Sequence, residues 1–185
     1  MTALLILLGL GALLGLYVIL AYNGLVRRVN LVEEGWSGIE TQLKRRADLV
    51  PNLVATVKGY AGHERNTLEE VTRMRGRALE AGSPAERAQA EMGLTAALGR
   101  LFALAEAYPD LKANKNFLEL QESLDEIEEA LNKARRYYNG TVRNLNIMIE
   151  SFPSNLVAQA FRFRQAEFFD LDDPADRAVP KVSFG

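Results

Sequence analysis

The chain has 185 residues, with 22 Lys or Arg against 24 Asp or Glu, so its formal net charge at pH 7 is -2. Without a basic excess it lacks the attraction that drives binding to a phosphate backbone, and nucleic acid is not expected as a partner. The chain has no cysteine, which excludes disulfides, thiolate nucleophiles and cysteine-ligated metal centres.

The first segment of the chain is apolar. No side chain from residue 2 to residue 22 carries a charge, and a helix of this length, rising about 1.5 Å per residue, spans the roughly 30 Å hydrocarbon core of a bilayer. We predict an uncleaved transmembrane anchor over residues 1–22, which meets the lipid bilayer through residues 2–22. The alternative is a secretory signal, which normally has a charged start and a shorter apolar stretch.

Cationic side chains follow the apolar segment. The first are Arg27 and Arg28, and Lys44, Arg45 and Arg46 come next. By the positive-inside rule, positive charge beside a transmembrane helix stays on the cytoplasmic side. We therefore expect a single-pass protein of the cell membrane, with its N-terminus outside and the remainder in the cytoplasm.

Two helical patterns come after the anchor. Apolar residues recur every three or four positions from Leu25 to Leu43, and again from Leu53 to Ala78, which lines one face of a helix. Pro51 lies between the two patterns. Because proline lacks an N–H and disfavours helix at the preceding residue, the chain is expected either to kink or to start a new helix there, and we favour a new helix.

Two further helices complete the expected fold. Ser83 and Pro84 predict the N-cap and the first residue of a helix that runs to about Ala107. The strongest periodic pattern runs from about Lys115 to Glu150 and extends over about five heptads. No stretch alternates with period two, so strands are not predicted.

These patterns predict an all-α fold, in which an N-terminal single-pass transmembrane helix precedes an antiparallel four-helix bundle with up-down-up-down topology. The expected parts are an anchor over residues 1–22 and the bundle over residues 23–152. An amphipathic membrane-proximal segment is expected over residues 153–169, followed by an acidic flexible tail over residues 170–185.

Two segments of nine residues resemble each other: YNGLVRRVN at residues 22–30 and YNGTVRNLN at residues 138–146. In an up-down-up-down bundle the first and last helices are antiparallel neighbours, so both segments are expected at the membrane-proximal end. Their polar side chains could pair with each other, bind lipid phosphates or contact a membrane partner. Alternatively, the similarity of the two segments is a coincidence between two helices of like composition. The candidate residues in the second segment are Tyr138, Asn139, Arg143, Asn144 and Asn146.

Phenylalanines concentrate after the last long helix. The topology returns this stretch to the bilayer surface, where aromatic side chains interleaved with arginine suit an interfacial position. Alternatively, the same side chains cap the open end of the bundle core. The candidate membrane-interface residues are Phe152, Phe161, Phe163, Phe168 and Phe169.

No arrangement of residues typical of a catalytic or metal site is recognised. His63 is the only histidine, and Thr67 stands where a zincin motif needs its second histidine. A di-iron bundle needs a Glu-x-x-His motif from each of two helices, which one histidine cannot supply. We predict no catalytic, cofactor-binding or metal-binding residue, and no cofactor.

Three motifs in the chain are QLKRRADLVPNLV at residues 42–54, YNGTVRNLN at residues 138–146 and SFPSNLVA at residues 151–158. Together they resemble motifs of the LemA family. The resemblance implies a bacterial-type single-pass membrane protein with a four-helix bundle. It also implies a biochemical role that is undefined for the family, and it supplies no catalytic residues to carry over.

A polar group lies around the expected turn at Pro51. Its side chains are expected either to present a charged recognition surface or to stabilise the helix ends locally. We predict a non-catalytic interaction or scaffold module at the membrane surface, with other membrane proteins as partners and no predicted oligomeric state. A sensor or ligand-binding bundle is the alternative, followed by a hydrolase with an unrecognised site. The candidate residues for the interaction surface or structural network around Pro51 are Lys44, Arg45, Arg46, Asp48 and Asn52.

Overall fold

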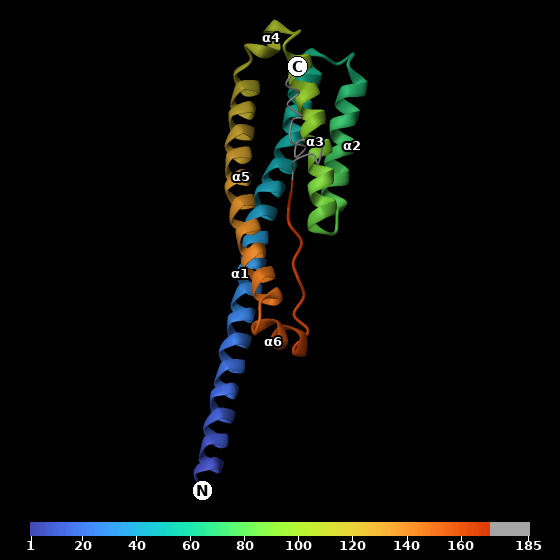
Figure 1. Cartoon of the computed structure of the whole chain (residues 1–185). Helices are drawn as coiled ribbons and strands as arrows, with labels where there is room; N and C mark the ends of the chain where they lie inside the picture. Colours follow the sequence, from blue (N-terminus) through green and yellow to red (C-terminus); the bar gives the residue numbers. More distant parts are fainter. Residues whose placement is uncertain (171–185) are drawn as a thin grey trace, which may run out of the picture. The chain divides into compact units, whose positions relative to one another are not determined.

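The structure, a computed structural model, describes residues 1–170, and every regular element in that range is a helix. The all-α prediction is therefore confirmed for the described part of the chain. The acidic tail predicted over residues 170–185 lies, from residue 171 onward, outside the described residues. The helices are α1 (Thr2–Tyr60), α2 (Arg65–Glu80), α3 (Pro84–Ala105), α4 (Pro109–Lys112), α5 (Lys115–Glu150) and α6 (Ser154–Ala160) (Figure 1).

α1 is one helix of 59 residues that includes Pro51. The prediction of a new helix at Pro51 is therefore wrong, and the chain turns only after Tyr60. Proline has no N–H, so in a helix the carbonyl four residues earlier, that of Ala47, lacks its usual partner. Arg75 of α2 donates from Nε to this carbonyl oxygen at 2.6 Å. A side chain from another helix thus supplies the hydrogen bond that the proline removes.

The start of α3 follows local sequence rules. Ser83 is the N-cap and Pro84 the first helical residue, as the sequence predicts. The backbone N–H of Glu86 donates to Ser83 Oγ at 3.2 Å, and the Glu86 carboxylate accepts from the backbone N–H of Ser83 at 3.2 Å. This capping box satisfies donors that the first turn of a helix leaves without partners.

The contacts of the chain group into two compact units. Among the described residues, unit 1 consists of Met1–Ile39 and Ala134–Phe168, and unit 2 consists of Glu40–Lys133 with Phe169 and Asp170. α1 and α5 each contribute residues to both units. Unit 1 also contains α6, while α2, α3 and α4 belong to unit 2.

Unit 2 is held together by an apolar core. Buried aliphatic side chains come from the unit 2 portions of α1 and α5 and from α2, α3 and α4. A link at the helix ends supplements the core: Asn114 Nδ2 donates to the Tyr60 hydroxyl at 2.9 Å, and its Oδ1 accepts from the N–H of Phe117 at 3.0 Å. The largest members of the core are Leu53, Leu68, Leu94, Leu98, Leu101, Leu111, Phe117 and Leu124.

In unit 1, α1 and α5 lie side by side and run in opposite directions. A Cβ built on Gly24 would lie 2.9 Å from Cε of Met148, and one built on Gly35 would lie 3.1 Å from Cα of Tyr138. Residue numbers thus rise along α1 as they fall along α5. The absence of a side chain at Gly35 lets the two backbones approach closely.

The first part of α1 is long and apolar enough to cross a membrane by length and composition alone. An 18-residue window has a mean hydropathy of 2.7, and none of it is buried in the protein. Large apolar side chains such as Leu10 and Leu13 are exposed. Burial begins at Ala21 and Leu25, which pack in the core of unit 1 with Leu145 and residues of α6.

Candidate functional site

Arg46 is the centre of a buried polar network in unit 2. Its Nη1 lies 2.8 Å from Oε2 of Glu91, and its Nη2 lies 2.8 Å from Oγ1 of Thr95 and 2.7 Å from Oε1 of Glu128. Arg46 and Glu91 are each 2% exposed. One guanidinium therefore connects α1, α3 and α5, because its planar fork presents several N–H donors in fixed directions.

Burial dominates the electrostatics of this network. Burial raises the pKa of Glu91 above its ordinary value, and the neighbouring Arg46 and Arg87 oppose that effect only in part. Arg46 Nε has no hydrogen-bond partner among the described residues. The network is closed from solvent at its centre, which suits a structural tie better than proton exchange with a substrate.

One of the two sequence interpretations placed Arg46 on a charged recognition surface, and the burial of Arg46 contradicts that position. Arg46 lies three residues after buried Leu43 and four before buried Val50, so it belongs to the apolar face of α1. Glu91, which the sequence analysis missed, occupies the same kind of position in α3, between Ala88 and Leu94. A charged residue within an apolar stripe was the available signal in both helices.

The other candidate residues near Pro51 are on the outside of α1. Lys44, Arg45, Asp48 and Asn52 are all exposed, and their spacing along the helix places them on neighbouring positions of one face. Arg45 donates from Nη1 to the Gln42 side chain at 3.3 Å. These four exposed residues form a mixed-charge surface, which we call the α1 polar face.

The two similar segments lie together in unit 1. Arg27, Arg28 and Leu31 from α1 and Thr141 and Asn144 from α5 line a pocket of about 430 Å³. Arg28 also donates from Nη1 to the carbonyl oxygen of Gly24 at 3.1 Å. The prediction that the first and last long helices bring these segments together thus agrees with the pocket.

Tyr138 and Asn146 hold the chain that follows α6. The Tyr138 hydroxyl donates to the carbonyl oxygen of Glu167 at 2.8 Å. Asn146 forms two bonds with Ala166: its Nδ2 donates to the carbonyl oxygen at 3.0 Å, and its Oδ1 accepts from the N–H at 2.9 Å. Figure 1 shows this stretch running back beside α5. Both motif residues therefore have a structural role, and burial raises the pKa of Tyr138.

The remaining candidates of the second segment differ in exposure. Arg143 and Asn144 are exposed, while Asn139 is half-buried. Of these three, the pocket shared with α1 is lined by Asn144. Arg143 stands on the outer surface of α5, where a cation is accessible to a partner or a lipid headgroup.

The five candidate interface phenylalanines occupy three kinds of position. Phe152 is 80% exposed and Phe161 is 53% exposed, whereas Phe163 is half-buried against the unit 1 core. Phe169 is fully buried, which contradicts its expected interfacial role. Phe168 is exposed but follows Glu167, whose carbonyl is bound to Tyr138. The bonded stretch after Phe163 runs along α5, so the last two phenylalanines are separated from the first three.

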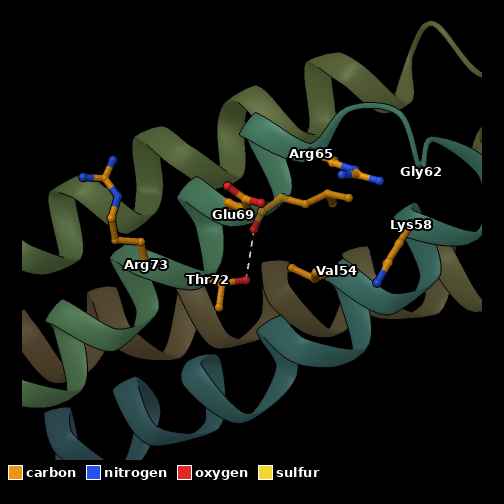
Figure 2. Close-up of a pocket in the computed structure, with 8 residues that line it drawn as sticks. Val54, Lys58, Gly62, Arg65, Glu69, Thr72 and Arg73 are labelled. Atoms are coloured by element: carbon orange, nitrogen blue, oxygen red, sulfur yellow. Dashed lines mark hydrogen bonds between the residues drawn. The ribbon is translucent and has the colours of Figure 1, made fainter.

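A pocket of about 590 Å³ lies in unit 2 where α1 ends and α2 begins. In Figure 2, Lys58 and Arg65 lie at the end near Gly62, and Arg73 lies apart from them. His63 is exposed and does not line this pocket. Within residues 1–170, no group of three or more His, Cys, Asp or Glu side chains is placed to hold a metal ion. The lining residues are Val54, Lys58, Gly62, Arg65, Leu68, Glu69, Thr72 and Arg73.

Comparison with known proteins gives consistent matches. A family model described as the LemA family matches residues 35–184. Protein LemA of Metamycoplasma hominis is 28% identical over an alignment that covers 82% of this chain and 69% of that protein. Magnetosome protein MamQ 2 of Paramagnetospirillum magneticum is 26% identical, covering 88% of this chain and 69% of that protein. MamQ of Magnetospirillum gryphiswaldense is 24% identical with the same coverage.

Proposed function

This chain belongs to the LemA family, and from that premise we propose that it is a non-catalytic interaction or scaffold module tethered to the cell membrane. The observation that carries the proposal is the continuity of α1. Its apolar first part exposes side chains that favour lipid, and the same helix supplies core residues to both units. A tethered module meets membrane partners at a raised effective concentration.

The proposal includes a four-helix bundle in unit 2. Its helices would be the second part of α1, α2, α3 and the first part of α5, in up-down-up-down order. The shared core and the buried Arg46 network support this arrangement, since both draw on more than two helices. The short connections between successive helices are typical of antiparallel neighbours.

We propose the α1 polar face as the surface that meets a protein partner. Its four members are exposed, and none of them is needed for the buried network around Arg46. Both signs of charge are present on it, so a partner with a complementary charge pattern would be selected over one without it. Charged contacts of this kind mainly set specificity and association rate.

Site-specific photo-crosslinking of the full chain in native membranes tests this surface. A benzoylphenylalanine at Asp48 is expected to give an adduct of defined mass, and the double reversal K44E/R45E is expected to abolish it. A crosslinker at Glu126, which is exposed on α5, is the matched control and should give no such adduct. An adduct that survives the reversal, or that also forms at Glu126, would contradict the proposed surface.

The proposed orientation places the folded part in the cytoplasm. It is supported by Arg27 and Arg28, which closely follow the apolar part of α1,. Because the chain lacks cysteine, single-cysteine variants report topology directly. With an impermeant maleimide, Thr2→Cys should be labelled on intact cells and Gly38→Cys only after permeabilisation. The opposite labelling pattern would reverse the orientation.

The pocket at the α1–α2 turn supports a second candidate, a ligand-binding or sensor module. Its volume of about 590 Å³ falls within the range of small-molecule sites, which is about 300–1,000 Å³. Lys58, Arg65 and Arg73 outnumber the single carboxylate, Glu69, so an anionic ligand would be favoured. Citrate and inorganic phosphate are suitable probes for the full chain: a saturable rise in melting temperature that K58A/R65A removes would favour this candidate.

A further inference from the structure

We infer that unit 1 carries a second membrane contact beside the anchor: an apolar patch of Phe152, Leu156 and Phe161, flanked by arginines, that seats on an anionic lipid surface. The inference rests on the proposed function in one respect, because it requires the first part of α1 to lie in a bilayer. It adds a lipid-binding surface formed by the chain around α6, and it specifies which phenylalanines take part.

The position of the patch follows from contacts with Tyr22, the last residue of the predicted anchor. The Phe161 ring packs edge-on against Tyr22 with centroids 4.8 Å apart, and the Phe163 ring does the same at 5.6 Å. Tyrosine commonly lies at the membrane–water interface at the end of a transmembrane helix. Phe161 is therefore held at the level where the anchor leaves the hydrocarbon.

The patch is apolar on its outer side and packed on its inner side. In α6, Val157 and Ala158 are buried against the α1 residues Ala21 and Leu25. Leu156, which precedes them in the same helix, is 58% exposed. Phe152 and Phe161, which flank α6, are 80% and 53% exposed. Inward residues thus fix the helix to the anchor and leave three large apolar side chains facing outward.

Exposure of these three apolar side chains to water is unfavourable, and insertion into a lipid interface removes that cost. Full removal of one large apolar side chain from water lowers the free energy by about 1.5–3 kcal/mol. The interfacial region on each side of the hydrocarbon is several ångströms deep, so a group within about 5 Å of Tyr22 reaches it. The capping of the bundle core does not account for the patch, because capping would bury these three residues.

Electrostatics selects the kind of lipid. From residue 143 to residue 165 the chain has three arginines and one glutamate. Arg162 and Arg164 directly follow the patch and are exposed, and Gln165 bonds to the glutamate, Glu150, at 2.7 Å. A basic residue near an anionic membrane surface contributes roughly 1 kcal/mol. The patch is therefore suited to a bilayer that contains anionic lipid.

Fluorescence quenching with the full chain in lipid nanodiscs tests the inference. Single cysteines at Leu156, Leu10 and Gly38 are labelled with an environment-sensitive dye, and lipids carry a quencher either at the headgroup or deep in the acyl chain. Gly38 is exposed in unit 1 and lies about 24 Å beyond Tyr22 along the continuous helix α1. It serves as the matched control outside the membrane.

The expected result is headgroup quenching at Leu156, deep quenching at Leu10 and neither at Gly38. If Leu156 behaves like Gly38 while Leu10 is quenched, the second contact is overturned and the anchor stands. If Leu10 is not quenched either, the proposed membrane anchor fails as well. The two failures are therefore distinguishable.

A second measurement tests the anionic selectivity. Headgroup quenching at Leu156 should be at least twofold stronger with one-third phosphatidylglycerol than in pure phosphatidylcholine, and R162Q/R164Q should remove the difference. Phe152→Ser, which alters the most exposed member of the patch, should reduce quenching in both lipids. Equal quenching of the unaltered chain in the two lipids would overturn the anionic selectivity.

Discussion

Arg75 Nε lies 2.6 Å from the carbonyl oxygen of Ala47, the atom that Pro51 leaves without a backbone partner. We expect Arg75→Met to lower the free energy of unfolding by about 1–2 kcal/mol, because it leaves a carbonyl in the helix without its donor. In a Pro51→Ala background the cost should shrink, since the alanine N–H can donate to Ala47. Urea unfolding of the full chain in detergent, followed by circular dichroism, measures this coupling.

The control for this cycle is Arg77→Met, which changes an exposed cation of the same helix. It should shift stability by less than about 0.5 kcal/mol in either background. An identical cost of Arg75→Met with and without Pro51 would show that the side chain does not replace the missing backbone bond.

The Arg46 network should resist even conservative substitution. Removing one partner of a buried ion pair typically costs about 3–5 kcal/mol, because the other charge is left buried and unpaired, so we expect a loss of that order for Arg46→Met. Arg46→Lys should recover little, since an ammonium cannot reproduce the planar fork. Arg45→Met, next in sequence but exposed, should be nearly neutral. Wild-type stability of Arg46→Lys would exclude a requirement for the fork.

The pH dependence of stability should carry the signature of Glu91. Because burial raises the pKa of Glu91 in the folded chain above its ordinary 4.5, the folded state binds more protons than the unfolded state between the two values. The free energy of unfolding therefore falls as pH rises through that interval. Arg46, Arg87 and Glu128 act on the same carboxyl.

Denaturation series of the wild type and Glu91→Gln from about pH 4 to about pH 8 isolate this contribution. The wild-type stability minus that of the variant should decrease with rising pH above 4.5, then level off once Glu91 is ionised in the folded state. A difference that increases over the same range would mean that the pairing with Arg46 outweighs burial.

Asn146 should control the stretch after α6. Asn146→Ala removes both bonds to Ala166, so hydrogen exchange at the Ala166 amide should accelerate about tenfold or more. Tyr138→Phe, which loses one bond to Glu167, should have a smaller effect at that amide. Asn144→Ala, at an exposed neighbouring position, is the control. Unchanged exchange at Ala166 in Asn146→Ala would contradict the assigned role.

Two glycines of α1 should respond oppositely to alanine. A Cβ on Gly38 meets no atom within 4 Å, while a Cβ on Gly35 would lie 3.1 Å from Cα of Tyr138. Gly38→Ala should therefore stabilise the helix by up to about 1 kcal/mol. Gly35→Ala should destabilise unit 1, because overpacking costs about 1–3 kcal/mol. Thermal unfolding of both variants decides; equal shifts would argue against close packing at Gly35.

The features that the sequence predicted correctly depend on neighbours in the chain. The capping box at Ser83 involves residues three apart, and α5 was found with its observed bounds, Lys115–Glu150, from its own periodicity. Pro51 was misread because its compensating donor, Arg75, stands 28 positions from Ala47. A proline rule considers only one helix and cannot include a side chain supplied by another.

The candidate site residues also fall into two groups: those whose position follows from the order of the helices, and those whose position depends on a distant part of the chain. The facing of the two similar segments follows from helix order, and the structure places both beside one pocket. The burial of Arg46 depends on Glu91, 45 positions away, so the charge of Arg46 alone suggested an exposed surface. The roles of Tyr138 and Asn146 depend on where an extended stretch runs after α6, for which the sequence offers no periodic signal.

Unit 1 is formed by two stretches that are far apart in the sequence, and this has a consequence for folding during synthesis. Ala21 and Leu25 pack against Val157 and Ala158, which a ribosome adds long after the first part of α1 has emerged. Contacts between such distant positions form late in folding. Ala21 and Leu25 therefore gain these partners only after the chain has been extended as far as Val157 and Ala158, and during synthesis the first part of α1 needs another apolar environment.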